Sequence, residues 1–369
     1  MQTRKTDRKP LNTRVLIAGF TTRHVACSAH AAGYSVCSVD HFCDRDLGLY
    51  TDEYLPFDDL ESLPRVIGMM KARHDFGMFV PTSGAELLDT GIPLCGCPVE
   101  TAEIFLDKLK TARFFHDTGV ISPEILEPGT FPAMVKPTHG SGGWRNAVIT
   151  SEREWHDWRS VMGDPPALWQ EVVEGTPASV CCIANGREAV AIAANEQVLR
   201  GDTYAKFGFS GSVTPLVHPL SGEMVRCAER IAAASGCRGT VGIDFILGKK
   251  VYAIEVNPRF QGTVDTVEMA TGLNLFSLHV AACRGHLPAR PPAAARFATR
   301  KILFAKEELI VDQDFPAYPF VADIPPSGTR IEQGGAVVSV YGWGASRRDA
   351  ILMLDKNIRT VQQYIGRTS

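Results

Sequence analysis

The chain has 369 residues, of which 45% are hydrophobic and 21% charged, and its formal net charge is −3. This length predicts two or three domains, and the composition is that of a soluble globular protein. The small net charge excludes a general attraction to nucleic acids or membranes, and no apolar run approaches the roughly 18 residues that would span a bilayer. The basic start, MQTRKTDRKPLNTR, has no apolar run behind it, so we expect a loose arm rather than a signal peptide, and a cytoplasmic protein.

Residues 1–98 show the alternation of strand and helix that is typical of a parallel α/β sheet. Strands are predicted at 14–20, 34–40 and within 75–84, and a helix at 22–33. The segment AGFTTRHV has one glycine where a dinucleotide fingerprint needs three, which disfavours a nicotinamide cofactor.

The rest of the chain mixes strands and helices. A helix is expected to start with Thr101 as its N-cap and to lead into Lys108 and Lys110. Later elements are a strand at 131–137, strands within 166–199, a helix at 221–237, a hairpin at 239–260 and a helix at 274–285. The segment 288–296, PARPPAAAR, is the nearest thing to a boundary, and short strands and a terminal helix at 346–365 follow it.

Ten cysteines raise the question of a metal site or disulfides. Cys95 and Cys97 are one residue apart and Cys181 and Cys182 are adjacent, but neither pair has the spacing of a zinc ribbon. We therefore expect buried, reduced thiols, which pack as small hydrophobes.

A glycine-rich loop follows Lys136, which lies at the end of a predicted strand. Its residues are His139, Gly140, Ser141, Gly142 and Gly143. Glycines let backbone N–H groups turn around a phosphate, and the lysine would neutralise its charge. The lysine precedes the glycines, so this is not a P-loop, and an ordinary flexible hairpin loop remains an equal alternative.

The hairpin carries polar residues at two-residue spacing, Glu255, Asn257 and Arg259, on one face of a predicted strand. Asp244, on the partner strand, can face them across the pair. Two carboxylates and an amide oxygen suit Mg²⁺, and the arginine could hold a phosphoryl oxygen. A solvated charged face is the alternative, but four such residues together argue against it.

Four segments then resemble the ATP-grasp enzymes in the order of that family: DKLKTARFFHDTGV, MVKPTHGSGG, WQEVVEGTPASV and GIDFILGKKVYAIEVNPRFQGT. The resemblance implies an ATP-grasp fold of mixed α/β and α+β class. It also implies an N-terminal parallel α/β (pre-ATP-grasp) domain at 1–98, an ATP-grasp domain at 99–290 and a small β-rich, carboxylase-like α+β domain at 291–369. A lid subdomain is expected at about 125–175.

The resemblance further implies roles for single residues. Lys108 and Lys136 correspond to the nucleotide-binding lysines, and the loop from Thr138 to Gly143 would close over the phosphates. The adenine edge would meet Gln170, Glu171 and Val173, and Glu174 would contact the ribose in place of the acid that many relatives have at the position of Pro177. Asp244, Glu255 and Asn257 match the ligands of Mg²⁺ or Mn²⁺, and Arg259 matches the arginine beside the transferred phosphoryl group.

The implied reaction joins a carboxylate to an amine through an acyl phosphate, with release of ADP and phosphate. The opening segment is similar to an archaeal-type carboligase group that includes tyramine–glutamate ligase, which suggests glutamate and tyramine or another pair of amino acid and amine. Candidate substrate residues lie at predicted strand ends: Thr21, Thr22, Arg23, Asp40 and Glu86. Surface loops and helix caps explain each of these five equally well.

Two other functions stay open, a bicarbonate- or carbamate-activating carboxylase and a nucleotide-binding protein without turnover. The sequence predicts small-molecule partners and leaves the oligomeric state open, a homodimer included.

Overall fold

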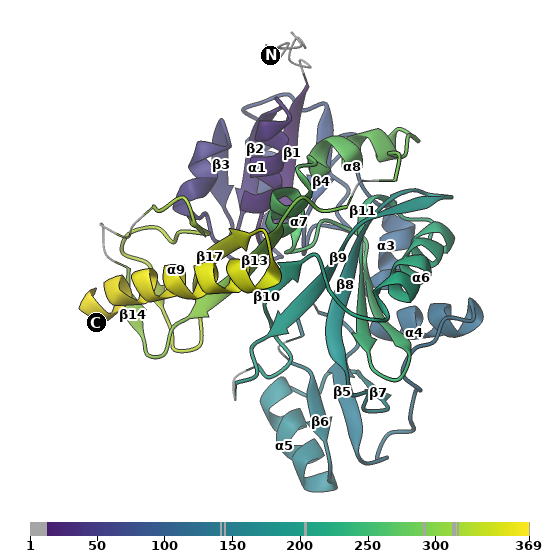
Figure 1. The fold of residues 1–369 in the computed structure, drawn as a ribbon. Helices are drawn as coiled ribbons and strands as arrows, with labels where there is room; N and C mark the ends of the chain where they lie inside the picture. The colour runs from purple at the N-terminus through teal and green to yellow at the C-terminus, as the bar shows by residue number, and fades with distance from the viewer. Residues whose placement is uncertain are drawn as a thin grey trace.

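The computed structural model describes residues 13–368 except 141, 144, 203–204, 291–292, 312–314 and 316. The predicted N-terminal arm therefore falls, apart from its last residues, outside the described part of the chain, as does Ser141. Figure 1 shows a small sheet at the N-terminal end, a long curved sheet through the middle, and a small three-stranded sheet at the opposite end of the molecule.

The small N-terminal sheet is parallel, with strand order β3-β2-β1-β4. Its strands are β1 (Arg14–Gly19), β2 (Ser35–Asp40), β3 (Glu53–Pro56) and β4 (Met78–Pro81). Its connections contain α1 (Arg23–Ala31), the 3₁₀ helix η1 (Arg45–Leu49) and α2 (Leu63–Lys71). The expected parallel α/β arrangement is thus confirmed, because the apolar strands 14–20 and 34–40 are buried side by side.

The long sheet has the order β12-β11-β8-β9-β10-β13-β17-β15, and all its paired strands are antiparallel. Its first five strands along the chain are β8 (Thr176–Asn185), β9 (Ala189–Leu199), β10 (Phe209–Thr214), β11 (Arg238–Leu247) and β12 (Val251–Asn257). The predicted hairpin is confirmed as β11 and β12, with Asp244 directly opposite Glu255.

Helices cover both faces of this sheet beside the hairpin. Val180 and Cys182 of β8 belong to the same core cluster as Ile231 of α6 (Ser221–Ala234). Cys181 and Ile183, which point the other way, join the cluster of α8 (Leu275–Cys283). Burial on both faces explains why β8 is continuously apolar instead of alternating. A short helix, α7 (Val264–Thr271), follows β12.

A three-stranded sheet, here called the lid sheet after the lid subdomain predicted at about 125–175, consists of β5 (Ala133–Pro137), β6 (Ala147–Ile149) and β7 (Ala167–Gln170), with β5 in the middle. The helix α5 (Glu152–Met162) packs on it. Trp155, Trp158 and Trp169 make this small core, in which the first two indoles stack at 5.3 Å between centroids. Large aromatic side chains give the lid a core of its own despite its size.

The prediction of a single helix that starts at Thr101 and leads into Lys108 and Lys110 is wrong. The chain forms α3 (Val99–Phe105) and then α4 (Lys108–Asp117). Asp107 interrupts them because its carboxylate accepts hydrogen bonds from the N–H groups of Leu109 and Lys110, which makes it the N-cap of α4. Lys108 therefore stands at the first turn of a new helix.

The C-terminal part continues the long sheet. Its strands are β13 (Phe297–Phe304), β14 (Leu309–Ile310), β15 (Val321–Ala322), β16 (Arg330–Ile331) and β17 (Ala336–Gly344). The helix α9 (Arg347–Thr368) lies against β17 and β13. Because β13 pairs with β10, one sheet crosses the predicted boundary at 290, and the division into three domains stays a prediction. In the described residues, no helix combines the length and apolarity needed to cross a membrane.

Candidate functional site

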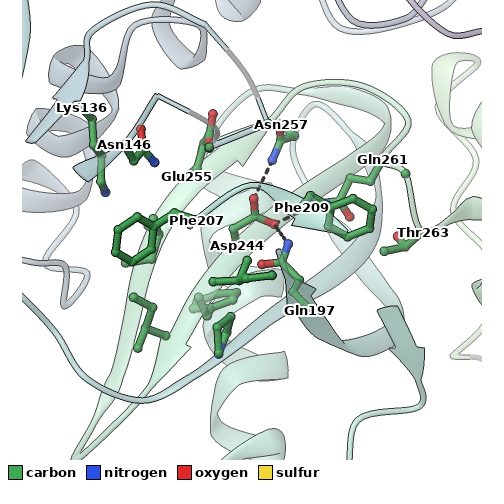
Figure 2. Close-up of a pocket in the computed structure, with 18 of the residues that line it drawn as sticks. Lys136, Asn146, Gln197, Phe207, Phe209, Asp244, Glu255, Asn257, Gln261 and Thr263 are labelled. Atoms are coloured by element: carbon green, nitrogen blue, oxygen red, sulfur yellow. Dashed lines mark hydrogen bonds between the residues drawn. The ribbon is translucent and has the colours of Figure 1, made fainter. Parts of the chain in front are cut away.

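A cavity of about 300 Å³ lies between the lid and the hairpin strands. Figure 2 shows its polar side chains converging from β5, the loop after it, β9, β11 and β12. The polar lining residues are Lys136, Asn146, Gln197, Asp244, Glu255, Asn257, Arg259, Gln261 and Thr263. Apolar residues form much of the remainder: Met134, Pro177, Leu199, Phe207, Phe209, Phe245, Ile246 and Ile254. An apolar wall beside a charged wall suits a ligand with a flat ring and an anionic chain.

Asp244 is at the centre of the polar wall, and three side-chain amides surround it (Figure 2). Its Oδ1 accepts from Gln197 Nε2 at 2.9 Å and from Gln261 Nε2 at 3.2 Å, and its Oδ2 accepts from Asn257 Nδ2 at 3.1 Å. Burial raises the pKa of Asp244 to about 7, and the like charge of Glu255 adds to the rise. The protein thus keeps two carboxylates side by side in the cavity, where burial makes the ionisation of Asp244 costly.

Gln261 depends on a glycine in the neighbouring strand. A Cβ on Gly242 would lie 1.7 Å from the Gln261 Cδ, so only glycine leaves room for this amide. The Nε2 of Gln261 donates to Asp244, while its buried Oε1 has no hydrogen-bond partner among the described residues. Gln261 was not predicted as a site residue from the sequence, although the two-residue spacing of the polar stripe continues past Arg259 to it.

Lys136 lies at the far side of the cavity, on β5, and is 6% exposed. Burial lowers the pKa of its ammonium to about 8, although the Glu255 carboxylate opposes this. Its Nζ donates to Gln170 Oε1 at 2.9 Å, and that amide donates on to the carbonyl of Pro123. Gln170 therefore holds the lysine, rather than lining the cavity itself.

The glycine-rich loop reaches the cavity through Gly142 and Gly143. Gly140, Gly142 and Gly143 all have positive φ, and a Cβ on Gly143 would lie 2.5 Å from the carbonyl oxygen of Phe207. Lys108 donates from its Nζ to the Gly140 carbonyl, and its backbone N–H donates to Thr138. The exposed His139 instead contacts Thr138 through Nδ1 at 3.1 Å. The structure thus brings Lys108, Lys136 and this loop to one side of the cavity.

Arg259 closes the cavity on the side of the N-terminal sheet. Its Nε donates to Glu86 Oε1 at 2.6 Å, and the two side chains are only 11% and 4% exposed. The other oxygen of Glu86 accepts from the N–H of Gly84, in the loop that follows β4. A carboxylate predicted to contact substrate therefore lies against the predicted phosphoryl-binding arginine.

The other predicted substrate residues lie away from the cavity. Asp40 is 1% exposed and accepts hydrogen bonds from the N–H and hydroxyl of Thr22 and from the N–H groups of Phe42 and Cys43. Thr21 is half-buried in the turn before α1 and does not line the cavity. Thr22 is the N-cap residue of α1, although its side chain bonds to Asp40 rather than capping the helix, and both residues are buried within the fold.

Arg23 is likewise used within the fold. Its guanidinium makes a two-pronged contact with Asp265 at 3.0 and 2.7 Å and another with Asp323 at 2.8 Å. Its Nε also forms an ion pair with the Asp46 Oδ2 at 3.6 Å, and the Arg23 residue is 3% exposed. These carboxylates come from α7, η1 and the loop after β15, so Arg23 joins three parts of the chain and does not reach the cavity.

The segment predicted to meet the adenine and ribose lies at the edge of the lid sheet. The backbone N–H of Glu171 donates to the Glu124 carbonyl at 2.9 Å, and the N–H of Glu124 donates to the Glu171 Oε1 at 3.2 Å. Val173 is half-buried and Glu174 exposed, and neither belongs to the described residues that line the cavity. Their predicted roles remain predictions.

Comparison with known families agrees with the fold described above. Residues 105–263, somewhat less than half of the chain, match the family model of the ATP-grasp domain. The fold of the chain is the ATP-grasp fold, as the sequence predicted. Proteins of the ATP-grasp superfamily are ATP-dependent ligases and carboxylase-like enzymes that act on small molecules.

Individual relatives extend over most of the chain. An uncharacterized protein of Methanocaldococcus jannaschii is 25% identical over 362 residues, which cover 89% of this chain and 88% of that one. The carbamoyl phosphate synthase large chain of Thermomicrobium roseum is 26% identical over 214 residues, and these cover 53% of this chain but only 20% of that protein.

Two solved structures show the same fold at low sequence identity. The biotin carboxylase domain of Hydrogenobacter thermophilus 2-oxoglutarate carboxylase, a dimer in complex with MgADP and bicarbonate, has a TM-score of 0.76 at 14% identity, covering 94% of this chain and 90% of that one. An L-amino acid ligase from Bacillus licheniformis has a TM-score of 0.70 at 16% identity, covering 94% and 97%.

Proposed function

We propose that the protein is an ADP-forming ligase, which activates a carboxylate with ATP as an acyl phosphate and joins it to an amine. The observation that carries this proposal is the convergence of Lys136, Asp244, Glu255, Asn257 and Arg259 on one cavity. Two cations and two carboxylates around one buried space are what a phosphoryl group and its metal ion require. The likeness to the L-amino acid ligase supports an amine as the second substrate.

The oxygen groups of the cavity fit Mg²⁺. Among the described residues nothing donates a hydrogen bond to the Glu255 carboxylate, and the Oε1 of Gln261 is also without a donor. Asp244, Glu255 and Asn257 would hold the ion, because carboxylate and amide oxygens are the ligands it prefers. When bound, the ion would neutralise charge on the phosphates of ATP.

The residues of the chain then act by position and charge. The apolar wall with Met134, Ile246 and Ile254 would receive the adenine ring, and Lys108, Lys136 and the glycine-rich loop would contact the phosphates. The substrate carboxylate attacks the γ-phosphorus in line with the departing ADP, while Arg259 faces the charge that develops on the transferred group. The amine next attacks the acyl carbon, phosphate leaves, and one proton is released.

Activation of bicarbonate is a second candidate, favoured by the likeness to the biotin carboxylase domain. The two candidates differ in what must be present for ADP to appear. A bicarbonate-activating enzyme would release ADP with bicarbonate alone, whereas a carboxylate–amine ligase needs an organic acid and its amine.

The test is a screen of ADP release with amino and other carboxylic acids crossed against amines, with bicarbonate alone as a separate arm. For an active pair, Arg259→Ala should retain ATP binding and lower turnover by about 10²-fold, the loss of one donor to a transition-state oxyanion. Arg348→Ala, at an exposed position on α9, is the matched control and should behave as wild type. ATP binding without ADP release in every arm would refute the ligase in favour of a nucleotide-binding protein.

A further inference from the structure

Outside the cavity, two pairs of thiols lie where the connector between β4 and α3 crosses the long sheet. The Sγ atoms of Cys95 and Cys283 and a ring nitrogen of His279 lie within 4.8 Å of one another. Cys95 interacts with Cys283, while Cys97, two residues on, interacts with Cys237. The alternating cysteines of the connector therefore meet different partners.

Three side chains of the kind that bind metals lie close enough to resemble a metal site, but both nitrogens of the imidazole are already in hydrogen bonds. The Nδ1 of His279 accepts the backbone N–H of Thr240 at 2.9 Å, so it carries no proton. The proton is on Nε2, which donates to the Cys95 carbonyl at 3.0 Å. Metal binding through Nε2 would require the doubly deprotonated ring and the loss of this hydrogen bond.

The ring is also fixed from both sides, so it cannot turn to offer another atom. It stacks on Phe260 with 4.6 Å between centroids, and a Cβ on Gly239 would lie 2.4 Å from the imidazole. With the histidine excluded, the chemistry left to this cluster is that of two neighbouring thiols.

The two thiols of the first pair differ in accessibility and in acidity, because their mutual contact lowers the pKa of Cys95 and raises the pKa of Cys283. Cys95 is 6% exposed, and the S–H of Cys283 lowers its pKa to about 5, with the His279 ring contributing. Cys283, at the end of α8, is half-buried, so a small oxidant can reach it. The second pair differs, because Cys97 and Cys237 are 3% and 0% exposed.

We propose that Cys95 and Cys283 are a site of reversible disulfide formation by a low-molecular-mass disulfide such as glutathione disulfide. One S–S bond forms between the two cysteines, the S–S bond of the oxidant is reduced, and the two protons leave on the two small thiols that it yields. The Cys97–Cys237 pair stays reduced because the oxidant cannot reach it in the folded protein.

The bond would join two parts of the structure that meet at the candidate site. Cys95 belongs to the connector that runs beside β4, since its N–H donates to the Phe79 carbonyl at 2.8 Å. Helix α8 packs on β11, the strand of Asp244. The cross-link would close a loop of about half the chain and hold the N-terminal sheet, whose loop after β4 carries Glu86, against the sheet of the cavity.

The experiment uses the full-length protein, purified with a reductant and then transferred without oxygen into buffer with or without glutathione disulfide. We expect the ten free thiols to fall by two, the mass to drop by two hydrogen atoms, and a peptide carrying Cys95 to be found linked to one carrying Cys283. The melting temperature should rise by about 5 °C and return after reduction, because the closed loop restricts the unfolded chain.

Cys283→Ser and Cys95→Ala should each abolish this cross-link and the rise in melting temperature. Cys227→Ser is the matched control, because Cys227 is half-buried on α6 and its thiol contacts Arg230 rather than another cysteine. A glutathione adduct on Cys283 with Cys95 still free would overturn the proposal. So would a cross-link between Cys97 and Cys237 alone, or a stoichiometric zinc or copper ion that is lost in Cys283→Ser.

Discussion

Gly242→Ala is the change that probes the candidate site most directly. The added methyl group would lie 1.7 Å from the Gln261 Cδ and 1.9 Å from its Nε2, so the amide must leave its place. Gly242 is on a strand with an ordinary backbone, so alanine brings a steric effect without strain in φ. Displacement of the Gln261 amide breaks its 3.2 Å hydrogen bond to the Asp244 carboxylate.

The expected loss in the free energy of unfolding has two parts of similar size, the broken hydrogen bond and the steric crowding. A hydrogen bond to a charged group contributes about 1.5 kcal/mol at the lower end of the usual range, and this lower value suits a bond as long as 3.2 Å. Crowding a packed interior costs roughly 1–3 kcal/mol, and the better strand preference of alanine over glycine returns about 0.5–1 kcal/mol. We expect the free energy of unfolding to fall by about 2 kcal/mol, measured by denaturant titration without metal ions.

A double-mutant cycle distinguishes the steric argument from a general defect. In a Gln261→Ala background the methyl group has room, so Gly242→Ala should cost nothing there. Both single variants should weaken Mg²⁺-dependent nucleotide binding by about tenfold in calorimetry, equivalent to about 1.4 kcal/mol. Gly222→Ala on α6, whose Cβ meets nothing closer than 3.6 Å, is the control. Equal destabilisation by Gly242→Ala in both backgrounds would refute the reasoning.

Three further changes test other parts of the structure. Glu86→Gln should leave ATP affinity unchanged and lower the rate of ADP release about tenfold, because a neutral amide holds the Arg259 guanidinium less firmly; equal losses in affinity and rate would contradict this. Asp40→Ala should lower the free energy of unfolding by about 3 kcal/mol, because it leaves two buried and two part-buried donors without their acceptor, yet leave nucleotide binding intact; weaker binding in the folded variant would instead support a substrate role. Burial lowers the pKa of His24 to about 4, below the value of about 6.5 in an unfolded chain, so the unfolded state binds the extra proton first and stability should fall as the pH drops from 6.5 to 4. His24→Gln should flatten that part of the stability profile, and an unchanged slope in chemical denaturation would show that other groups cause it.

Local patterns in the sequence were sufficient for much of the candidate site. The alternation of Glu255, Asn257 and Arg259 predicts one polar face of a strand, and the turn at 248–250 predicts the hairpin that brings Asp244 opposite it. The glycine-rich loop after Lys136 also lies where the sequence places it. The same stripe continues to Gln261, whose role depends on its contact with Asp244 and on the room that Gly242 leaves, neither of which the spacing alone predicts.

Contacts between distant segments could not be predicted in this way. Arg23 and Glu86 both follow strands of the N-terminal sheet, and nothing local shows that one meets Asp265 and Asp323 while the other meets Arg259. The break between α3 and α4 was not predicted because an aspartate can stand inside a helix or cap one. Only the structure shows that the Asp107 carboxylate accepts the first N–H groups of α4.

The sequence by itself determined the ATP-grasp fold and the polar face of the hairpin, because these follow from short motifs and from strand periodicity. The tertiary structure alone decided which side chains share the cavity, which carboxylates are used up inside the fold, and which of ten cysteines lie within reach of each other. The physical reason is that period and propensity act over a few residues, whereas burial, pKa and charge pairing depend on groups that can be 300 residues apart, as Arg23 and Asp323 are.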